Sequence, residues 1–154
     1  MKRLIVFILL SILLCGVNIS FAKDLTIDKI FPSFNMEVYI SEKSNLSFDK
    51  IDNGIGEIIF CETKDLEYIL HNCSKVAGFT IKIQNMEIND IIKSLNATNT
   101  FAQNFGVYGW SKIFENLNEV NNKSIEISSK VVNFQCVARE DYVLVGMPII
   151  LGSF

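Results

Sequence analysis

The chain has 154 residues, a formal net charge of −3 and a hydrophobic content of 49%. This length fits one domain with a continuous core, and the apolar content argues against an intrinsically disordered chain. The excess of acidic groups repels nucleic-acid phosphates, so the composition disfavours a DNA-binding or RNA-binding protein.

Residues 1–22 have the order of a secretory signal peptide. Two basic residues precede an apolar stretch at 4–17, and Ser20-Phe21-Ala22 supplies a small-residue cleavage pattern. The apolar stretch is shorter than the roughly 20 residues that cross a bilayer. Leu14 stands before Cys15, where lipid attachment needs a small residue. We therefore predict an exported, extracellular or envelope-associated protein, with membrane contact only through an uncleaved N-terminal segment.

The first part of the exported chain is predicted to contain a β-hairpin. Residues 23–34 lack a clear periodicity and are treated as a lead-in segment to a single α+β domain at 35–154. Apolar and polar residues alternate at 36–40, as in a half-buried strand. Asp52-Asn53-Gly54 has turn chemistry, and 55–61 is predicted to be the second strand.

Two amphipathic helices are expected in the middle of the chain. From Asp65 onward, apolar residues fall at the i, i+3, i+4 and i+7 spacing of a helix as far as Cys73, and Gly78 is interpreted as a stop signal. A strand at 79–83 follows directly. The helical spacing then recurs at 86–95.

The last third is predicted to be mostly strand. It begins with an aromatic stretch at 101–110, which a short helix at 112–117 follows. Residues 132–138 and 142–145 alternate on either side of Glu140-Asp141, and they form the clearest predicted hairpin.

The apolar residues at 147–151 have the composition of a further strand. Pro148 lacks an N–H donor, so it belongs at the start of a strand or at a sheet edge. The sequence of strands and two amphipathic helices predicts an α+β fold.

The cysteines and the histidine give little support to catalysis. Cys61, Cys73 and Cys136 remain after removal of residues 1–22, and an odd number cannot form a complete disulfide framework. A helix rise of about 1.5 Å per residue separates Cys61 from Cys73 by more than about 10 Å, so we expect buried free thiols. His71 is the only histidine and is expected to face solvent. No catalytic, cofactor-binding or metal-ligating residue is assigned.

A group of carboxylates raises one enzymatic alternative. Glu57, Glu62, Asp65 and Glu67 lie close together in the sequence, as the acid pair of a glycosidase or a cation site would require. Their spacing matches no calcium loop. Helix-dipole stabilisation of Asp65 and Glu67, together with a solvated strand face for Glu57, explains the same pattern.

Aromatic residues form the candidate binding surface. Phe105, Tyr108, Trp110 and Phe114 follow Phe101 closely and are separated by glycines. Aromatic rings provide contact area for sugars, peptides or proteins at a low cost in conformational entropy. An aromatic strand packed beneath the helices would produce the same pattern, so exposure of Tyr108 and Trp110 decides between the two interpretations.

The second half of the chain contains four short motifs: YGWS at 108–111, KVVNFQCVAR at 130–139, VGMPII at 145–150 and LGSF at 151–154. Through these motifs the segment 54–154 resembles the YwmB-like exported proteins of Gram-positive bacteria. Met147 departs from the small polar residue expected there, and the chain is shorter than usual members. The resemblance implies a fold similar to that of TATA-box-binding domains, with a curved antiparallel sheet and about two helices on one face. It implies no activity, because fold does not determine function.

Three hypotheses for function follow. The first is a non-enzymatic exported protein that binds an envelope protein or a cell-wall polymer, without a cofactor. The second is an envelope-directed hydrolase that uses Glu57, Glu62 or Asp65. The third is a sporulation or assembly accessory protein, in which a sheet edge near Pro148 recruits a partner strand.

Overall fold

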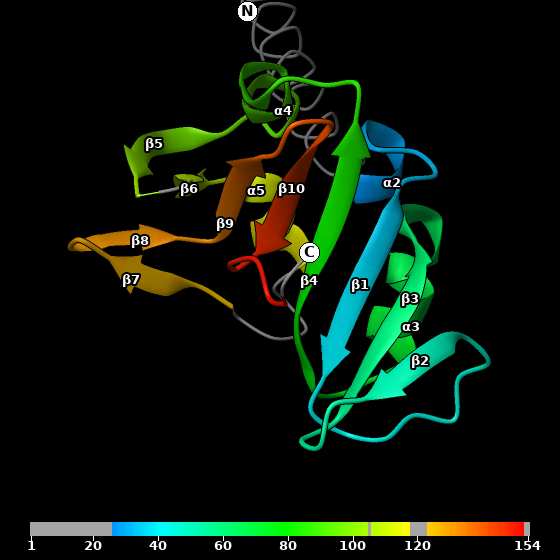
Figure 1. Cartoon of the computed structure of the whole chain (residues 1–154). Helices are drawn as coiled ribbons and strands as arrows, with labels where there is room; N and C mark the ends of the chain where they lie inside the picture. The colour runs from blue at the N-terminus through cyan, green and yellow to red at the C-terminus, as the bar shows by residue number, and fades with distance from the viewer. Residues whose placement is uncertain (1–25, 105, 118–122, 153–154) are drawn as a thin grey trace, which may run out of the picture.

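The computed structural model describes residues 26–104, 106–117 and 123–152. The predicted signal peptide at 1–22 and Phe105 of the candidate binding surface lie outside the described residues. The described part of the chain is built around an antiparallel sheet with the strand order β2-β3-β1-β4-β10-β9-β6-β5 (Figure 1).

The strands of this sheet are β1 (Asn35–Ile40), β2 (Asp49–Asp52), β3 (Glu57–Glu62), β4 (Val76–Gln84), β5 (Thr98–Gln103), β6 (Gly106–Trp110), β9 (Phe134–Ala138) and β10 (Tyr142–Met147). Strands β7 (Ile125–Ile127) and β8 (Lys130–Val132) form a separate hairpin. The helices are α2 (Ile27–Ile30), α3 (Leu66–Asn72), α4 (Ile88–Ser94) and α5 (Lys112–Leu117), and a 3-10 turn, η1 (Thr63–Asp65), precedes α3. The predicted α+β class is confirmed. Helices α3, α4 and α5 correspond to the helices expected at 65–73, 86–95 and 112–117, and α2 is an additional helix in the predicted lead-in segment.

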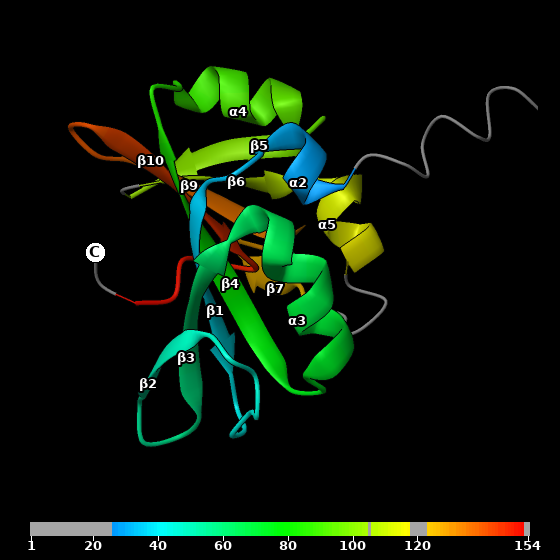
Figure 2. The ribbon, with the colours of Figure 1, turned by 90° about the vertical axis from the view of Figure 1, so that its right-hand side faces the viewer.

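The core lies between the helices and one face of the sheet. Figure 2 shows α2, α3 and α5 on the same side of the strands. Alternate residues of each central strand point to this side, as in β4, where Phe79, Ile81 and Ile83 are fully buried. Ile27 and Phe31, which belong to the predicted lead-in segment, also lie in this core. We call the opposite side of the sheet the open face.

Residues 148–152 cross the open face after β10. The backbone N–H of Ile150 donates to Gln135 Oε1 at 3.1 Å, and that of Leu151 donates to Thr80 Oγ1 at 3.2 Å. The Thr80 hydroxyl also donates to the Leu151 carbonyl at 3.3 Å. The chain can approach this closely because Gly78 has no side chain: a Cβ there would lie 2.2 Å from the Met147 carbonyl oxygen. Gly78 therefore stands inside β4 instead of stopping a helix.

Two expectations for the C-terminal region are wrong. Residues 147–151 do not form a strand of their own, since β10 ends at Met147. Pro148 is not at a sheet edge either, because β10 pairs with β4 on one side and with β9 on the other. The two edges of the sheet are β2 and β5. This removes the structural basis for strand recruitment near Pro148.

Two other segments differ from the prediction in their pairing. The turn at Asn53-Gly54 exists, but it joins β3 to the short strand β2, which the sequence pattern does not indicate. The aromatic stretch 101–110 forms two antiparallel strands, β5 and β6. Asn104 adopts a positive φ of 53° between them, a conformation that asparagine tolerates well.

Candidate functional site

Three aromatic residues lie on the adjacent strands β5 and β6 at one edge of the sheet, and we call them the aromatic surface: Phe101, Tyr108 and Trp110. All three side chains are half-buried, so each keeps part of its surface accessible to solvent. Tyr108 stands opposite Phe101 in the β5–β6 pairing, and their rings stack at a centroid distance of 5.6 Å and an interplanar angle of 23°. The partial exposure of Tyr108 and Trp110 favours the binding interpretation of this segment.

Hydrogen bonds hold both polar aromatic side chains in place. Gln135 Nε2 on the neighbouring strand β9 donates to the Tyr108 hydroxyl at 3.0 Å. The Trp110 indole N–H donates to Glu115 Oε2 of α5 at 3.3 Å. Because the rings are fixed before any ligand arrives, little additional conformational entropy is lost on binding.

The backbone that follows Trp110 is anchored by a buried polar pair. Asn133 Oδ1 accepts from the Ser111 N–H, and Asn133 Nδ2 donates to the Ser111 carbonyl, both at 2.8 Å. The Ser111 hydroxyl donates to the Leu95 carbonyl at 2.6 Å. Both side chains are fully buried, and these bonds satisfy their polar atoms. They fix the junction between β6 and α5, and with it the backbone of Trp110.

The β7–β8 hairpin packs beside the aromatic surface. Lys130 Nζ lies 4.4 Å from the centroid of the Phe101 ring, a cation–π geometry. Ser128 at the hairpin turn donates to Gln103 Oε1 at 2.7 Å. The aromatic surface therefore has a positive charge at its border, in a protein of acidic net charge.

Phe114 cannot contribute to this surface. Its side chain is fully buried, with ring centroids 5.9 Å from Phe79 and 6.0 Å from Phe134. α5 directs it into the core because Ile113 and Phe114 form the buried side of this helix. Of the predicted surface residues that the structure describes, Tyr108 and Trp110 are half-buried on the same strand, β6, whereas Phe114 is buried in the core.

The carboxylates of the enzymatic alternative are separated into two groups. Glu57 and Glu62 stand at opposite ends of β3, about 17 Å apart at a rise of about 3.4 Å per residue. Glu62 and Asp65 form a reciprocal capping box at η1, in which Asp65 Oδ2 accepts from the Glu62 N–H at 3.0 Å. Lys64 pairs with Glu62 at 2.8 Å. These contacts give Glu62 and Asp65 a structural role.

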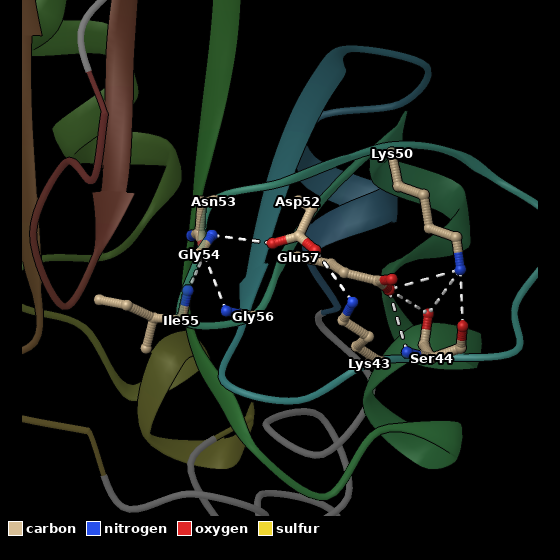
Figure 3. Close-up of polar contacts among 9 residues, drawn as sticks. All are labelled: Lys43, Ser44, Lys50, Asp52, Asn53, Gly54, Ile55, Gly56 and Glu57. Atoms are coloured by element: carbon tan, nitrogen blue, oxygen red, sulfur yellow. Dashed lines mark hydrogen bonds and ion pairs between the residues drawn. The ribbon is translucent and has the colours of Figure 1, made fainter.

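Glu57 is held by the loop before β2 (Figure 3). Its Oε2 accepts from the Ser44 backbone N–H at 3.0 Å and from the Ser44 hydroxyl at 3.1 Å, and Lys50 Nζ lies 3.4 Å away. The backbone hydrogen bond is the largest influence that lowers the pKa of Glu57, and the Ser44 hydroxyl and Lys50 lower it further. A general acid needs a raised pKa, so this environment does not suit that role.

The expected burial of the thiols is confirmed for Cys73 and Cys136, whereas Cys61 is only half-buried. Cys61, Cys73 and Cys136 are free, with the last two buried. Burial raises the pKa of Cys136 to about 12, and burial followed by the charges of Asp65 and Glu62 raises the pKa of Cys61 to about 12. His71 is exposed. The thiols are therefore protonated and weakly nucleophilic at neutral pH.

Comparisons with known proteins identify no relatives. In the part of the chain that the structure describes, no helix combines the length and the apolar character that a membrane crossing requires. The chain matches no family model, and no significant match is found among curated proteins or solved structures. The resemblance to YwmB-like exported proteins thus stays a prediction, and the aromatic surface is the feature on which a functional proposal can rest.

Proposed function

We propose that this chain is an exported, non-enzymatic protein that binds a component of the cell envelope through the aromatic surface. The observation that carries the proposal is the fixed, half-exposed group of Phe101, Tyr108 and Trp110 beside the β5 edge. Tyrosine and tryptophan are enriched among residues that dominate binding energy, because they combine a large apolar area with a polar tip. Export is inferred from the sequence order at 1–22.

The hydrolase alternative has less support. It needs two carboxyl groups about 5 to 9.5 Å apart across a cleft, one of them with a raised pKa. Glu57 lies too far from Glu62 along β3, and Glu62 and Asp65 cap a 3-10 turn. An accessory role in assembly remains compatible with the proposal if the bound component is a protein.

Binding to isolated envelope fractions tests the proposal. The chain is purified from an exporting host and incubated separately with insoluble cell-wall polymer and with solubilised envelope proteins. We expect retention by one fraction and a shift in the emission of Trp110, the only tryptophan. Trp110→Ala and Tyr108→Ala should each weaken retention by about 30-fold, the effect of truncating a residue that contributes about 2 kcal/mol.

Tyr68→Ala serves as the matched control. Tyr68 is 57% exposed on α3, away from the aromatic surface. Its loss should leave retention unchanged. Equal retention of the Trp110 and Tyr68 variants, or no retention of the wild-type chain by either fraction, would contradict the proposal. Release of soluble fragments from the polymer would instead support the hydrolase.

A further inference from the structure

Strand β2 is an uncovered edge of the large sheet. It pairs with β3 alone among the described strands, and all four of its residues are exposed. Figure 2 shows β2 beside β3 at the lower end of the sheet. The other edge, β5, is interrupted by a register shift between Thr98 and Phe101, and irregularities of this kind protect an edge from pairing. β2 pairs regularly along its whole length, so it is the better template for another strand.

The geometry of the β2–β3 hairpin determines which backbone N–H and C=O groups of β2 are not bonded to β3. The Asn53 N–H donates to the Gly56 carbonyl at 3.2 Å, so these residues form a hydrogen-bonded pair. Such pairs alternate along an antiparallel ladder, which makes Ile51 and Ile58 the next one. The N–H and C=O groups of Lys50 and Asp52 therefore point outward, away from β3.

Apolar side chains collect on the same hairpin. Among the described residues the exposed large hydrophobic side chains are Ile51 at 57%, Ile55 at 84%, Phe60 at 37%, Tyr68 and Val131. Three of these five lie between Asp49 and Glu62. Ile51 stands opposite Ile58 and on the same face as Phe60. A cluster of this kind beside a free edge indicates an interaction surface.

We propose that β2 pairs antiparallel with β2 of a second copy of this chain, with the two-fold axis at Ile51. Residues whose backbone N–H and C=O groups point outward must pair with residues of the same kind in the second copy. Because such residues alternate along β2, the two-fold axis has to pass through a residue and not between two residues. An axis at Asp49, Lys50 or Asp52 places identical charges opposite each other. An axis at Ile51 places Lys50 of each copy opposite Asp52 of the other, and both residues have free backbone groups.

Charge complementarity extends beyond the strand itself. Within one copy, Lys43 Nζ lies 3.0 Å from Asp52, and Lys50 Nζ lies 3.4 Å from Glu57 (Figure 3). Pairing Asp52 with Lys50 of the second copy joins these ion pairs into a row of alternating sign on each side of the axis. The same patch is used by both copies, as a two-fold interface requires.

The pairing produces one continuous sheet with the aromatic surfaces at its two outer ends. Because β2 is only four residues long, we expect a weak dimer with a dissociation constant of about 10–100 μM. Each copy contributes one aromatic surface, so dimerisation would make envelope binding bivalent. The dimer itself does not depend on the proposed binding function.

Cysteine crosslinking at the axis tests the register. Ile51 would face its own copy in a non-hydrogen-bonded pair, with Cα atoms about 4.5 Å apart, which is within disulfide reach. The purified Ile51→Cys chain is oxidised at about 50 μM and compared with Val131→Cys, whose position is 56% exposed on β8. We expect Ile51→Cys dimers to form about tenfold faster, because pairing raises the effective concentration. The native thiols have raised pKa values and compete poorly.

Light scattering supplies a measurement that does not need the new disulfide. The wild-type chain should rise from monomer to dimer mass as its concentration increases to about 1 mM, whereas Ile51→Lys, which sets two positive charges at the axis, should stay monomeric. Ile51 is mostly exposed, so the substitution leaves the core intact. Equal crosslinking of the two cysteine variants, or a wild-type chain that stays monomeric at about 1 mM, overturns the proposal.

Discussion

Gly78→Ala tests whether residues 148–152 are an integral part of the fold. The added Cβ would lie 2.2 Å from the Met147 carbonyl oxygen and 3.0 Å from a Leu151 methyl carbon. Residues 148–152, which we call the crossing segment, therefore have to move away from the sheet. This movement breaks the three hydrogen bonds to Gln135 and Thr80, which contribute about 0.5–1.5 kcal/mol each, or about 1.5–4.5 kcal/mol together. Alanine also lowers the conformational entropy of the unfolded chain, which stabilises the folded state by about 0.4–1 kcal/mol. We therefore expect a net loss of about 0.5–4 kcal/mol.

Urea unfolding followed by circular dichroism measures this loss, and thermal unfolding should show a lower midpoint by about 4 °C per kcal/mol. Gly54→Ala is the control, because Gly54 has a φ of +83° but a Cβ added there would have no other atom within 4 Å. Gly54→Ala should cost about 1 kcal/mol from backbone strain alone. Amide exchange at Leu151 separates the two variants, since only Gly78→Ala should accelerate it. A Gly78→Ala chain with wild-type stability and wild-type exchange at Leu151 would refute the reasoning.

Three further outcomes follow from the packing and the charges. Phe114→Ala should lower the free energy of unfolding by about 3–5 kcal/mol in urea titrations, and a loss under about 1 kcal/mol would contradict its place in the core. The lowered pKa of Glu57 stabilises the fold above the ordinary glutamate pKa of about 4.3, and this contribution is lost as the pH falls through the folded value. The urea midpoint of Glu57→Gln should therefore decline less steeply than that of the wild-type chain as the pH falls below about 4.3. An unchanged decline would show that other groups cause the loss of stability. Cys136 should react with a thiol reagent at about pH 8 only in the unfolded chain, and rapid labelling of the native chain would disprove its burial.

The amphipathic elements of the fold were predictable from the sequence. Leu66, Ile69 and Leu70 have helical spacing, and all three are buried in α3. The alternation of Phe79, Ile81 and Ile83 with polar residues likewise identifies β4 and its core side. In both cases one side of the element faces the core, so its hydrophobic period appears directly in the sequence.

Strand β2 was not predictable in this way. Its sequence, Asp49-Lys50-Ile51-Asp52, has three charged residues, and none of the four is buried. A strand that is exposed on both faces leaves no hydrophobic period. It forms because Asn53 Oδ1 accepts from the Gly56 N–H at 2.8 Å and closes the turn onto β3.

The candidate site was predictable only as a group of aromatic residues. Spacing alone could not separate Phe114, which α5 turns into the core, from Trp110, which stays half-exposed. The crossing segment posed a similar difficulty, because a short apolar run has the same composition whether it forms a strand or lies across one. Gly78 and Gly146 permit the close approach, since a Cβ at Gly146 would lie 2.3 Å from the Ile150 nitrogen. A glycine in a sequence does not indicate which segment packs against it.

The position of β10 has a consequence for how the protein is made. It is the last strand of the sheet along the chain, yet it joins the half that contains β4 to the half that contains β9. Until a ribosome has delivered Tyr142–Met147, the nascent chain holds two incomplete halves, each with an unpaired edge. The sheet is therefore completed late, through contacts that are distant in sequence and slow to form. For the exported protein that we propose, this delay would give a translocation machinery time to accept the chain before it is folded.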